Sequence, residues 1–196
     1  QNISFDEISI NSRDLKENSL FFPIKGKNFN GHDFILNAFQ NGAIASIIEE
    51  KEINKINKDL FGKKILIPVK DSLKSLQDFS RYIRERPNNL NMICITGSSG
   101  KTSVKDWIST ILSSFFITHS NYGNFNNQIG MPLSLARMRK ETEVCVLELG
   151  MNKPGEIAFL TEISKPDFSI LTNVGPAHLG NFKNIDEIVI EKSSIF

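Results

Sequence analysis

The sequence predicts an α/β fold in two parts: a small N-terminal α/β domain, then a P-loop type, mostly parallel sheet flanked by helices. Short apolar runs alternate with amphipathic helical patterns along the 196 residues, which indicates βαβ units. A loop of small residues joins one such run to a helix near residue 100. A charged helix end meets a proline and turn-forming residues at 86–89, so we place the boundary between residues 1–87 and residues 88–196.

The first part is expected to hold two helices and four short strands. Residues 32–41, followed by Gly42, fit one helix. The other helix covers residues 72–86, with Asp71 as its N-cap. The strands are the apolar runs at 8–10, 20–24, 45–48 and 65–69.

The second part is expected to begin with a strand at 90–96 and to continue with buried strands at 144–149 and 168–172. Pro132 and Pro154 stand where the first turn of a helix tolerates proline, and residues 185–196 fit a last helix. After the loop of small residues, apolar side chains recur at helical spacing and can lie on a sheet, which predicts that the tryptophan among them is in the core. This stripe consists of Val104, Trp107, Ile108, Ile111, Leu112 and Phe115.

Composition excludes several classes of protein. With 40% hydrophobic residues and a net charge of +1, the chain can form a packed core and is not disordered. Its 23 basic and 22 acidic residues lack the positive excess of an electrostatic nucleic-acid binder. Cys94 and Cys145 sit in apolar runs and are expected to be reduced core thiols. No apolar run is long enough for a membrane span and no signal pattern is present, so we expect a cytoplasmic protein.

The segment 96–103, Thr-Gly-Ser-Ser-Gly-Lys-Thr-Ser, carries the clearest chemical signal. Glycines let backbone N–H groups turn toward an anion, a helix N-terminus adds a positive dipole, and Lys101 supplies a full charge. Thr102 can then bind magnesium. The spacing is shorter than in the commonest P-loop, because Ile95 occupies the position of the first glycine. The competing interpretation is a Gly-Ser turn that caps a helix.

Two residues follow strands at the edge where open α/β sheets bind ligands. Glu148 can reach a magnesium ion held by phosphates there, although a strand-end acid can equally be a solvated one. His178 follows another strand, and its alternative is a structural loop histidine. Asn124, Asn126 and Asn127 gather side-chain amides before a helix, where they either orient a polar substrate or form Asx turns.

Several segments together resemble the Mur ligase family, and within it the branch that adds D-alanyl-D-alanine. They are residues 96–103, 123–132, 147–150 with 155–157, and 177–179. The early segments 11–13 and 25–33 are similar to the UDP-binding N-terminal domain of that branch.

The resemblance implies an ATP-dependent, magnesium-requiring ligase of peptidoglycan synthesis in the bacterial cytoplasm. Such an enzyme phosphorylates the terminal carboxylate of UDP-N-acetylmuramoyl-tripeptide, and the amine of D-alanyl-D-alanine then attacks the acyl phosphate. The resemblance also implies site roles. ATP would be bound by Gly97, Ser98, Ser99, Gly100, Lys101, Thr102 and Ser103. Metal would be held by Thr102, Glu148, His178 and a carbamylated Lys192, and catalysis would use Lys101, Glu148, His178 and Lys192. Substrate would be contacted by Ser12, Arg13, Asn30, Gly31, His32, Asn124, Asn126 and Asn127.

From the residues alone, Lys192 is expected to be a solvated helix lysine. The resemblance also implies that residues 88–196 form only part of a central ATPase domain, so we expect a monomeric fragment without ligase activity of its own. Three alternatives stay open. They are another Mur-type amino acid ligase or folate-glutamate ligase, a nucleotide- or UDP-substrate-binding module without ligation, and an unrelated P-loop NTPase.

Overall fold

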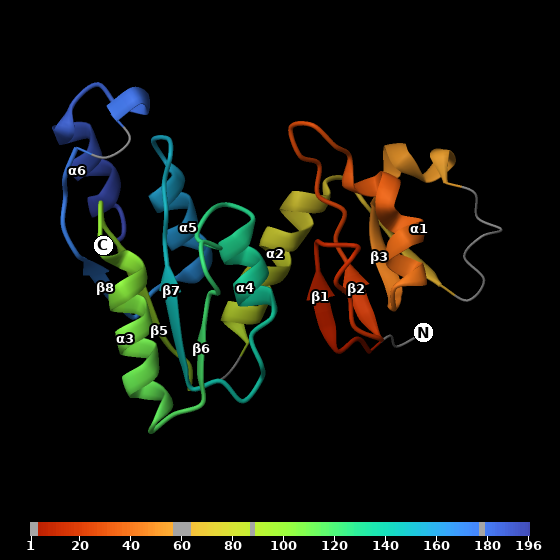
Figure 1. Cartoon of the computed structure of the whole chain (residues 1–196), viewed down its shortest axis with the longest axis horizontal. Coiled ribbons are helices and arrows are strands. Elements are labelled where there is room, and N and C mark those ends of the chain that lie inside the picture. The colour runs from red at the N-terminus through yellow and green to blue at the C-terminus, as the bar shows by residue number, and fades with distance from the viewer. Residues whose placement is uncertain (1–3, 57–63, 87–88, 177–178) are drawn as a thin grey trace. The chain divides into compact units, whose positions relative to one another are not determined.

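The computed structural model describes residues 4–56, 64–86, 89–176 and 179–196. The chain divides into two compact units, Gln1–Asp78 and Phe79–Phe196. Each is built on a four-stranded, parallel sheet, which confirms the predicted α/β class (Figure 1). The division between these units lies inside helix α2 (Ser72–Glu85), where Phe79 and Ile83 pack on the core of the second unit.

The first unit has the strand order β1-β2-β3-β4. Its strands are β1 (Glu7–Ser9), β2 (Ser19–Phe21), β3 (Ala43–Glu49) and β4 (Ile65–Val69). Its helical elements besides α2 are η1 (Gly31–Phe34), α1 (Ile35–Gln40) and η2 (Glu50–Lys55). The predicted helix at 32–41 is thus divided into a 3-10 turn and a short α-helix. The predicted N-cap is confirmed, since Asp71 Oδ1 accepts the N–H of Lys74 at 2.7 Å.

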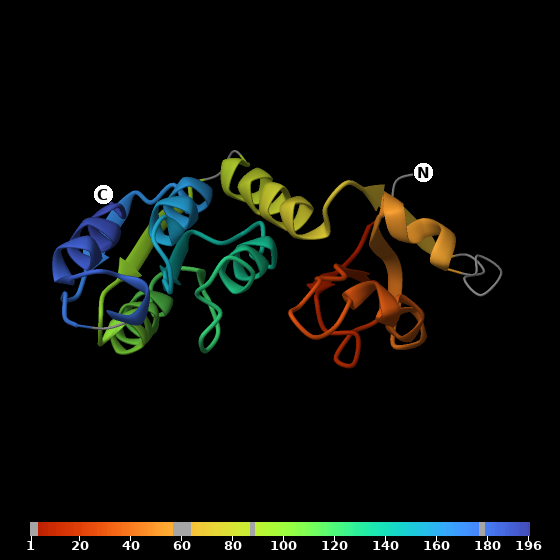
Figure 2. The ribbon, with the colours of Figure 1, turned by 90° about the horizontal axis from the view of Figure 1, so that it is seen from above.

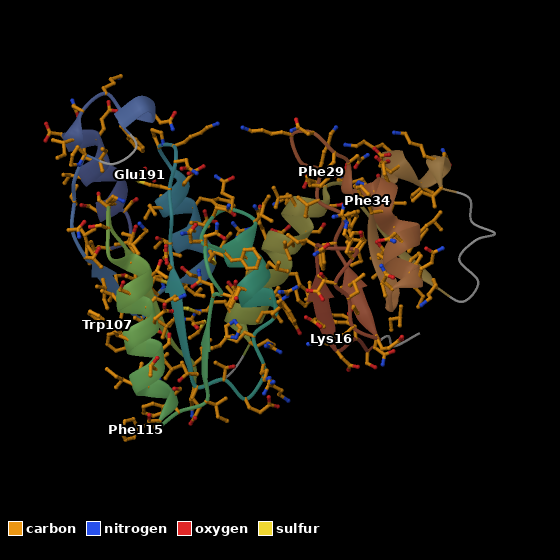
Figure 3. All side chains as sticks on the ribbon, in the orientation of Figure 1. Lys16, Phe29, Phe34, Trp107, Phe115 and Glu191 are labelled. Carbon is orange, nitrogen blue, oxygen red and sulfur yellow. The ribbon has the colours of Figure 1, made fainter. Side chains whose placement is uncertain are left out.

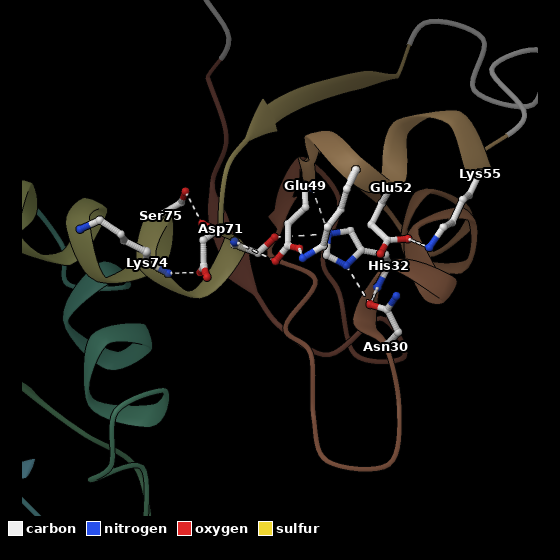
Figure 4. A network of polar contacts seen from close by, with 10 residues as sticks. Asn30, His32, Glu49, Glu52, Lys55, Asp71, Lys74 and Ser75 are labelled. Atoms are coloured by element: carbon white, nitrogen blue, oxygen red, sulfur yellow. Dashed lines mark hydrogen bonds and ion pairs between the residues drawn. The ribbon is translucent and has the colours of Figure 1, made fainter.

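A buried histidine links three elements of this unit (Figure 4). The side chain of His32 is 5% exposed. Its Nδ1 lies 2.9 Å from Asn30 Oδ1, and its Nε2 lies 3.1 Å from the backbone nitrogen of Glu49. Because the amide oxygen only accepts and the backbone N–H only donates, the imidazole carries its proton on Nδ1 and is neutral. Ser72 Oγ, 3.4 Å from Nε2, adds the start of α2 to the link between η1 and β3.

The second unit has the strand order β6-β7-β5-β8. Its strands are β5 (Asn91–Thr96), β6 (Thr118–Ser120), β7 (Val144–Glu148) and β8 (Phe168–Leu171). Its helices are α3 (Lys101–Ser113), α4 (Gly130–Ala136), α5 (Glu156–Ser164), η4 (Leu179–Asn181) and α6 (Ile185–Ser193). Strand β6 was not predicted, because its three residues, Thr-His-Ser, carry no apolar alternation. Within the described part of the chain, no helix is long and apolar enough to cross a membrane.

Alternate residues of β7 face opposite sides of this sheet, as the strand period requires. Val144 and Val146 pack with α3 on one face. Cys145 and Leu147 pack on the other face with apolar residues of α4, α5 and α6. Figure 2 shows the sheet between α3 and α5. Both cysteines are free and buried as predicted, and burial raises the pKa of the Cys94 thiol to about 12.

The apolar stripe of α3 divides into a buried row and an exposed row. Val104, Ile108 and Leu112 pack against the strands. Trp107, Ile111 and Phe115 are 68%, 62% and 76% exposed (Figure 3). The prediction that Trp107 lies in the core is therefore wrong. Residues four apart already cover the strands, and a side chain three positions along is turned about 60° away from that row.

We expect the stability of the first unit to fall as the pH drops from 6.5 toward 5. Burial lowers the pKa of His32 from its ordinary 6.5, although the charges of Glu49 and Glu52 oppose the shift. The unfolded chain then takes up a proton that the folded unit does not accept. The stabilisation by neutral His32 is complete above pH 6.5 and is lost toward the lower folded pKa.

Hydrogen exchange of the β3 amides, corrected for the intrinsic rate, measures this pH dependence of stability in the wild type and in His32→Gln. Protection should fall with pH between 6.5 and 5 only in the wild type. The pKa of Glu52 lies below its ordinary 4.5 because of the hydrogen bond to Lys55, so this carboxylate does not titrate in the same window. Constant protection in the wild type would contradict the assignment.

Candidate functional site

The small-residue loop joins β5 to α3, as the sequence predicts. Gly100 is the N-cap of α3 and has φ +77°, a left-handed conformation that glycine adopts without strain. The first-turn N–H groups of α3 have no acceptor within the helix, and the helix dipole adds positive potential at that end. Lys101 Nζ donates to the carbonyl oxygen of Gly97 at 2.8 Å. Donors and positive charge thus gather where a phosphate group can bind.

The segment after β8 accepts hydrogen bonds from the backbone of this loop. The N–H of Ser98 donates to the carbonyl oxygen of Asn173, and the N–H of Ser99 donates to Asn173 Oδ1, both at 3.0 Å. A Cβ atom on Gly97 would lie 1.9 Å from Thr172 Oγ1, so the approach of the two segments requires glycine. Asn173 therefore accepts one loop N–H on its backbone and another on its side chain. It was not singled out from the sequence, although it closely follows the strand β8.

Glu148 is the last residue of β7, and its side chain is 2% exposed. Its Oε2 accepts the hydroxyl hydrogen of Thr102 at 2.6 Å. Its Oε1 accepts a hydrogen from Asn126 Nδ2 at 2.7 Å. Thr102 and Glu148, both predicted metal residues, therefore meet at the start of α3.

This donor set fits magnesium. A hydroxyl and a carboxylate offer the hard oxygen ligands that Mg²⁺ prefers, and Mg²⁺ bound with nucleotide phosphates uses only one or two carboxylates. The described residues contain no group of three or more histidine, cysteine, aspartate and glutamate side chains placed to hold a metal. A hydroxyl and one carboxylate leave coordination positions that phosphate oxygens can take.

A second asparagine fixes the backbone of Glu148. Asn121, 1% exposed, accepts the N–H of Glu148 at 2.9 Å and donates to its carbonyl oxygen at 3.1 Å. Its amide also donates to the carbonyl oxygen of Phe125 at 2.9 Å. The side chain thus bonds to β7 as the backbone of a neighbouring strand would. Sequence reasoning missed Asn121 because it follows β6, which was not recognised.

The structure distinguishes the three asparagines predicted to contact substrate. Asn126 bonds to Glu148. Asn127 Oδ1 instead accepts the N–H groups of Ile129 and Gly130 at 3.0 and 2.9 Å, so it forms the Asx turn that starts α4. Asn124 is exposed. Substrate contact by these residues stays a prediction.

Lys192 lies on α6 and is 2% exposed, so the expectation of a solvated lysine is wrong. Burial and, second, the charge of Lys101 lower the pKa of Lys192 to about 8, while Glu191 opposes the shift. The two lysines are therefore close enough to interact electrostatically. They belong to α6 and to the phosphate loop end of α3.

The carboxylate of Glu191 links α6 to the start of α5. Glu191 Oε2 accepts the N–H of Gly155 at 2.6 Å, and its Oε1 accepts the N–H of Ile157 at 2.7 Å. These N–H groups at the N-terminus of α5 have no acceptor within the helix, and the helix dipole also favours a negative charge there. Glu191 was missed because one acid on a helix gives no signal of the distant amides that it caps.

The remaining predicted residues have separate surroundings. Asn30 caps η1, whose first residues are Gly31 and His32. Ser12 is buried, and its carbonyl oxygen accepts a hydrogen from Asn41 Nδ2 at 2.8 Å, whereas Arg13 is exposed. Contact of these five residues with a UDP group stays a prediction. His178 lies outside the described residues. Ser103 is exposed in the first turn of α3.

Comparison with known proteins gives a consistent result. The family model described as Mur ligase middle domain matches residues 95–196, and that described as Mur ligase family, catalytic domain, matches residues 4–84. The chain is 39% identical over 195 residues to UDP-N-acetylmuramoyl-tripeptide–D-alanyl-D-alanine ligase of Rickettsia prowazekii, covering 99% of this chain and 41% of that protein.

Solved structures agree with these matches. A crystal structure of MurF from Acinetobacter baumannii superimposes with a TM-score of 0.85 at 35% identity over 96% of this chain and 40% of that one. MurF ligase from Thermotoga maritima in complex with ADP superimposes with a TM-score of 0.83 at 34% identity over 100% of this chain and 44% of that one. The chain thus spans about two fifths of the length of the relatives that it matches.

We expect Glu191→Ala to destabilise the second unit by about 2 kcal/mol, because two helix-terminal N–H groups lose a charged acceptor. Urea unfolding followed by circular dichroism measures the loss. Glu162→Ala is the matched control, since it removes an exposed ion pair with Arg81 (3.2 Å) and should cost far less. Equal losses in the two variants would contradict the capping role.

Proposed function

The chain belongs to the Mur ligase family, and on that premise we propose that it forms the substrate-binding and ATP-binding parts of a UDP-N-acetylmuramoyl-tripeptide–D-alanyl-D-alanine ligase. Residues 1–87 would bind the UDP substrate and residues 88–196 would bind ATP with Mg²⁺. The substrates come from the names of the relatives. The observation that supports the proposal most directly is the contact of Thr102 with Glu148 beside the phosphate loop.

The reaction joins a carboxylate to an amine. A carboxylate is a poor electrophile, so an oxygen of the tripeptide carboxylate first takes the terminal phosphoryl group of ATP, and ADP leaves. The amine nitrogen of D-alanyl-D-alanine then attacks the carbonyl carbon of the acyl phosphate. A tetrahedral intermediate collapses with release of phosphate, and the nitrogen loses a proton. Negative charge is spread over phosphoryl oxygens during the first transfer.

The residues of this chain would supply position and charge. Lys101 would place its ammonium group on the transferring phosphate, and the first-turn N–H groups of α3 would donate to phosphate oxygens. Thr102 and Glu148 would hold Mg²⁺, which when bound offsets phosphoryl charge. His178 and Lys192 would complete a second metal site. None of these groups serves as a covalent nucleophile.

The environment of Lys192 supports its carbamylation. A pKa of about 8 leaves about a tenth of the side chain neutral at pH 7. A neutral amine can add to the carbon of CO₂ and lose a proton, which forms a carbamate. This addition would replace a buried cation near Lys101 with an anion that can bind metal.

Lys101→Ala should weaken Mg-ATP binding at least tenfold, because the charge nearest the phosphates is removed. Isothermal titration of the chain measures this, with Lys140→Ala, an exposed lysine, as the charge-matched control. Binding of UDP-N-acetylmuramoyl-tripeptide should be unaffected by Lys101→Ala and tighter than binding of UDP-N-acetylglucosamine. Absence of binding to ATP and to both sugar nucleotides would refute the proposed function.

Carbamylation predicts a carbamate signal in the ¹³C NMR spectrum of the chain equilibrated with ¹³C-bicarbonate. The signal should disappear in Lys192→Arg, which keeps the positive charge but has no reactive amine. A signal that persists in this variant would assign the carbamate to another amine, and a wild type without a signal would refute carbamylation of the chain.

A further inference from the structure

We propose that Asn126 is a positioning residue for the magnesium carboxylate: its side-chain amide fixes Glu148 in the orientation that binds the metal. This inference rests on the proposed function and adds to it a specific role for one residue of the asparagine-rich loop. The juxtaposition that carries it is Asn126 Nδ2 at 2.7 Å from Glu148 Oε1.

The two oxygens of Glu148 are held by donors from different segments. Thr102 Oγ1 donates to Oε2 at 2.6 Å, and Asn126 donates to Oε1. One hydrogen bond would let the carboxylate rotate about its last torsion, whereas two donors on opposite oxygens define its plane. Since Glu148 is 2% exposed, water gives little replacement for a lost donor. Truncation of Asn126 would therefore leave one oxygen without its donor and the plane unfixed.

Backbone hydrogen bonds hold the loop so that the amide of Asn126 lies beside Glu148. The carbonyl oxygen of Asn126 accepts the N–H of Gly150 at 2.8 Å, just beyond the end of β7. The carbonyl oxygen of the preceding residue, Phe125, accepts a hydrogen from Asn121 Nδ2 at 2.9 Å, and Asn121 also bonds to the backbone of Glu148. The backbone of the loop is thus fastened on both sides of Asn126, which fixes the point from which the side chain reaches Glu148.

Gly150 leaves the space that the amide occupies. A Cβ atom at this position would lie 2.7 Å from both Cγ and Oδ1 of Asn126. The atoms in conflict are the end of a flexible side chain, so an alanine can be accommodated if the amide moves. Gly150→Ala therefore displaces the donor without removing it.

Groups that orient a metal ligand typically change metal affinity by 10–100-fold when they are removed. We therefore expect Asn126→Ala to raise the Mg²⁺ concentration that half-saturates ADP binding by at least about tenfold. The affinity for ADP in EDTA should equal that of the wild type. Titration of ADP at a series of Mg²⁺ concentrations measures both quantities on the full chain.

Asn127→Ala is the matched variant from the same loop. It removes the Asx turn at the start of α4, so it should lower the melting temperature and leave the Mg²⁺ dependence of ADP binding unchanged. A Mg²⁺ dependence of Asn126→Ala equal to that of the wild type would overturn the proposal. An equal rise of the half-saturating Mg²⁺ concentration in both variants would also overturn it, because a less stable loop would then explain the effect.

Gly150→Ala gives an independent test. It should raise the Mg²⁺ concentration that half-saturates ADP binding, as Asn126→Ala does. In a chain that already carries Asn126→Ala, it should cause no further rise. Additive effects of the two substitutions would contradict displacement of the amide.

Thermal unfolding of the metal-free chain separates this inference from the proposed function. The melting-temperature shifts of Asn126→Ala and Glu148→Ala should be non-additive in the double variant, because each removes the same hydrogen bond. Additive shifts would contradict the hydrogen bond between Asn126 and Glu148, and with it this inference, but not the proposed function. A wild type without Mg²⁺-dependent ADP binding would overturn the proposed function, and the magnesium role of Asn126 with it.

Discussion

A carboxylate that is withdrawn from water needs hydrogen-bond donors, and Glu148 imposes this requirement on the segments around it. Thr102 donates to the carboxylate from the start of α3, and Asn126 donates to it from the loop before α4. Asn121 holds the backbone of the same residue from the end of β6. The parallel sheet makes this convergence possible, because β6 and β5 flank β7 and their carboxyl ends meet at one edge. The loop of small residues leaves β5 at that edge, so Glu148 and the first turn of α3 share a location.

Buried polar side chains perform the same structural task at two other places. Glu191 connects α6 to the first amides of α5, and α6 carries Lys192 into the interior. In the first unit, His32 connects η1 to the end of β3 through an acceptor nitrogen. Each of these contacts joins segments whose backbones are not paired in a helix or sheet. The position of candidate site residues therefore depends on buried side-chain hydrogen bonds between segments.

The sequence predicts the fold class and the strand–loop–helix arrangement around Lys101 well, because both follow from local patterns: apolar runs, a helical period, and glycines before Lys101. It also predicts the end-of-strand position of Glu148. It cannot distinguish Asn126 from Asn127: Asn127 bonds to backbone N–H groups two and three residues along, whereas Asn126 bonds to Glu148, 22 residues away in the chain. Lys192 and Trp107 show the same limit in opposite senses: a charged residue is buried and an aromatic residue is exposed. Local period gives the face of a helix, whereas burial depends on which other elements cover that face.

The exposed row of α3 has a consequence for spectroscopy. Trp107 is the one tryptophan of the chain, and its indole is open to solvent two turns along the helix that begins with Lys101 and Thr102. Its emission spectrum therefore reports the dielectric surroundings of the surface of α3, and unfolding of the packed interior changes those surroundings little. The intrinsic fluorescence of this protein is thus a probe of what approaches α3, while the integrity of the two cores has to be followed by other signals.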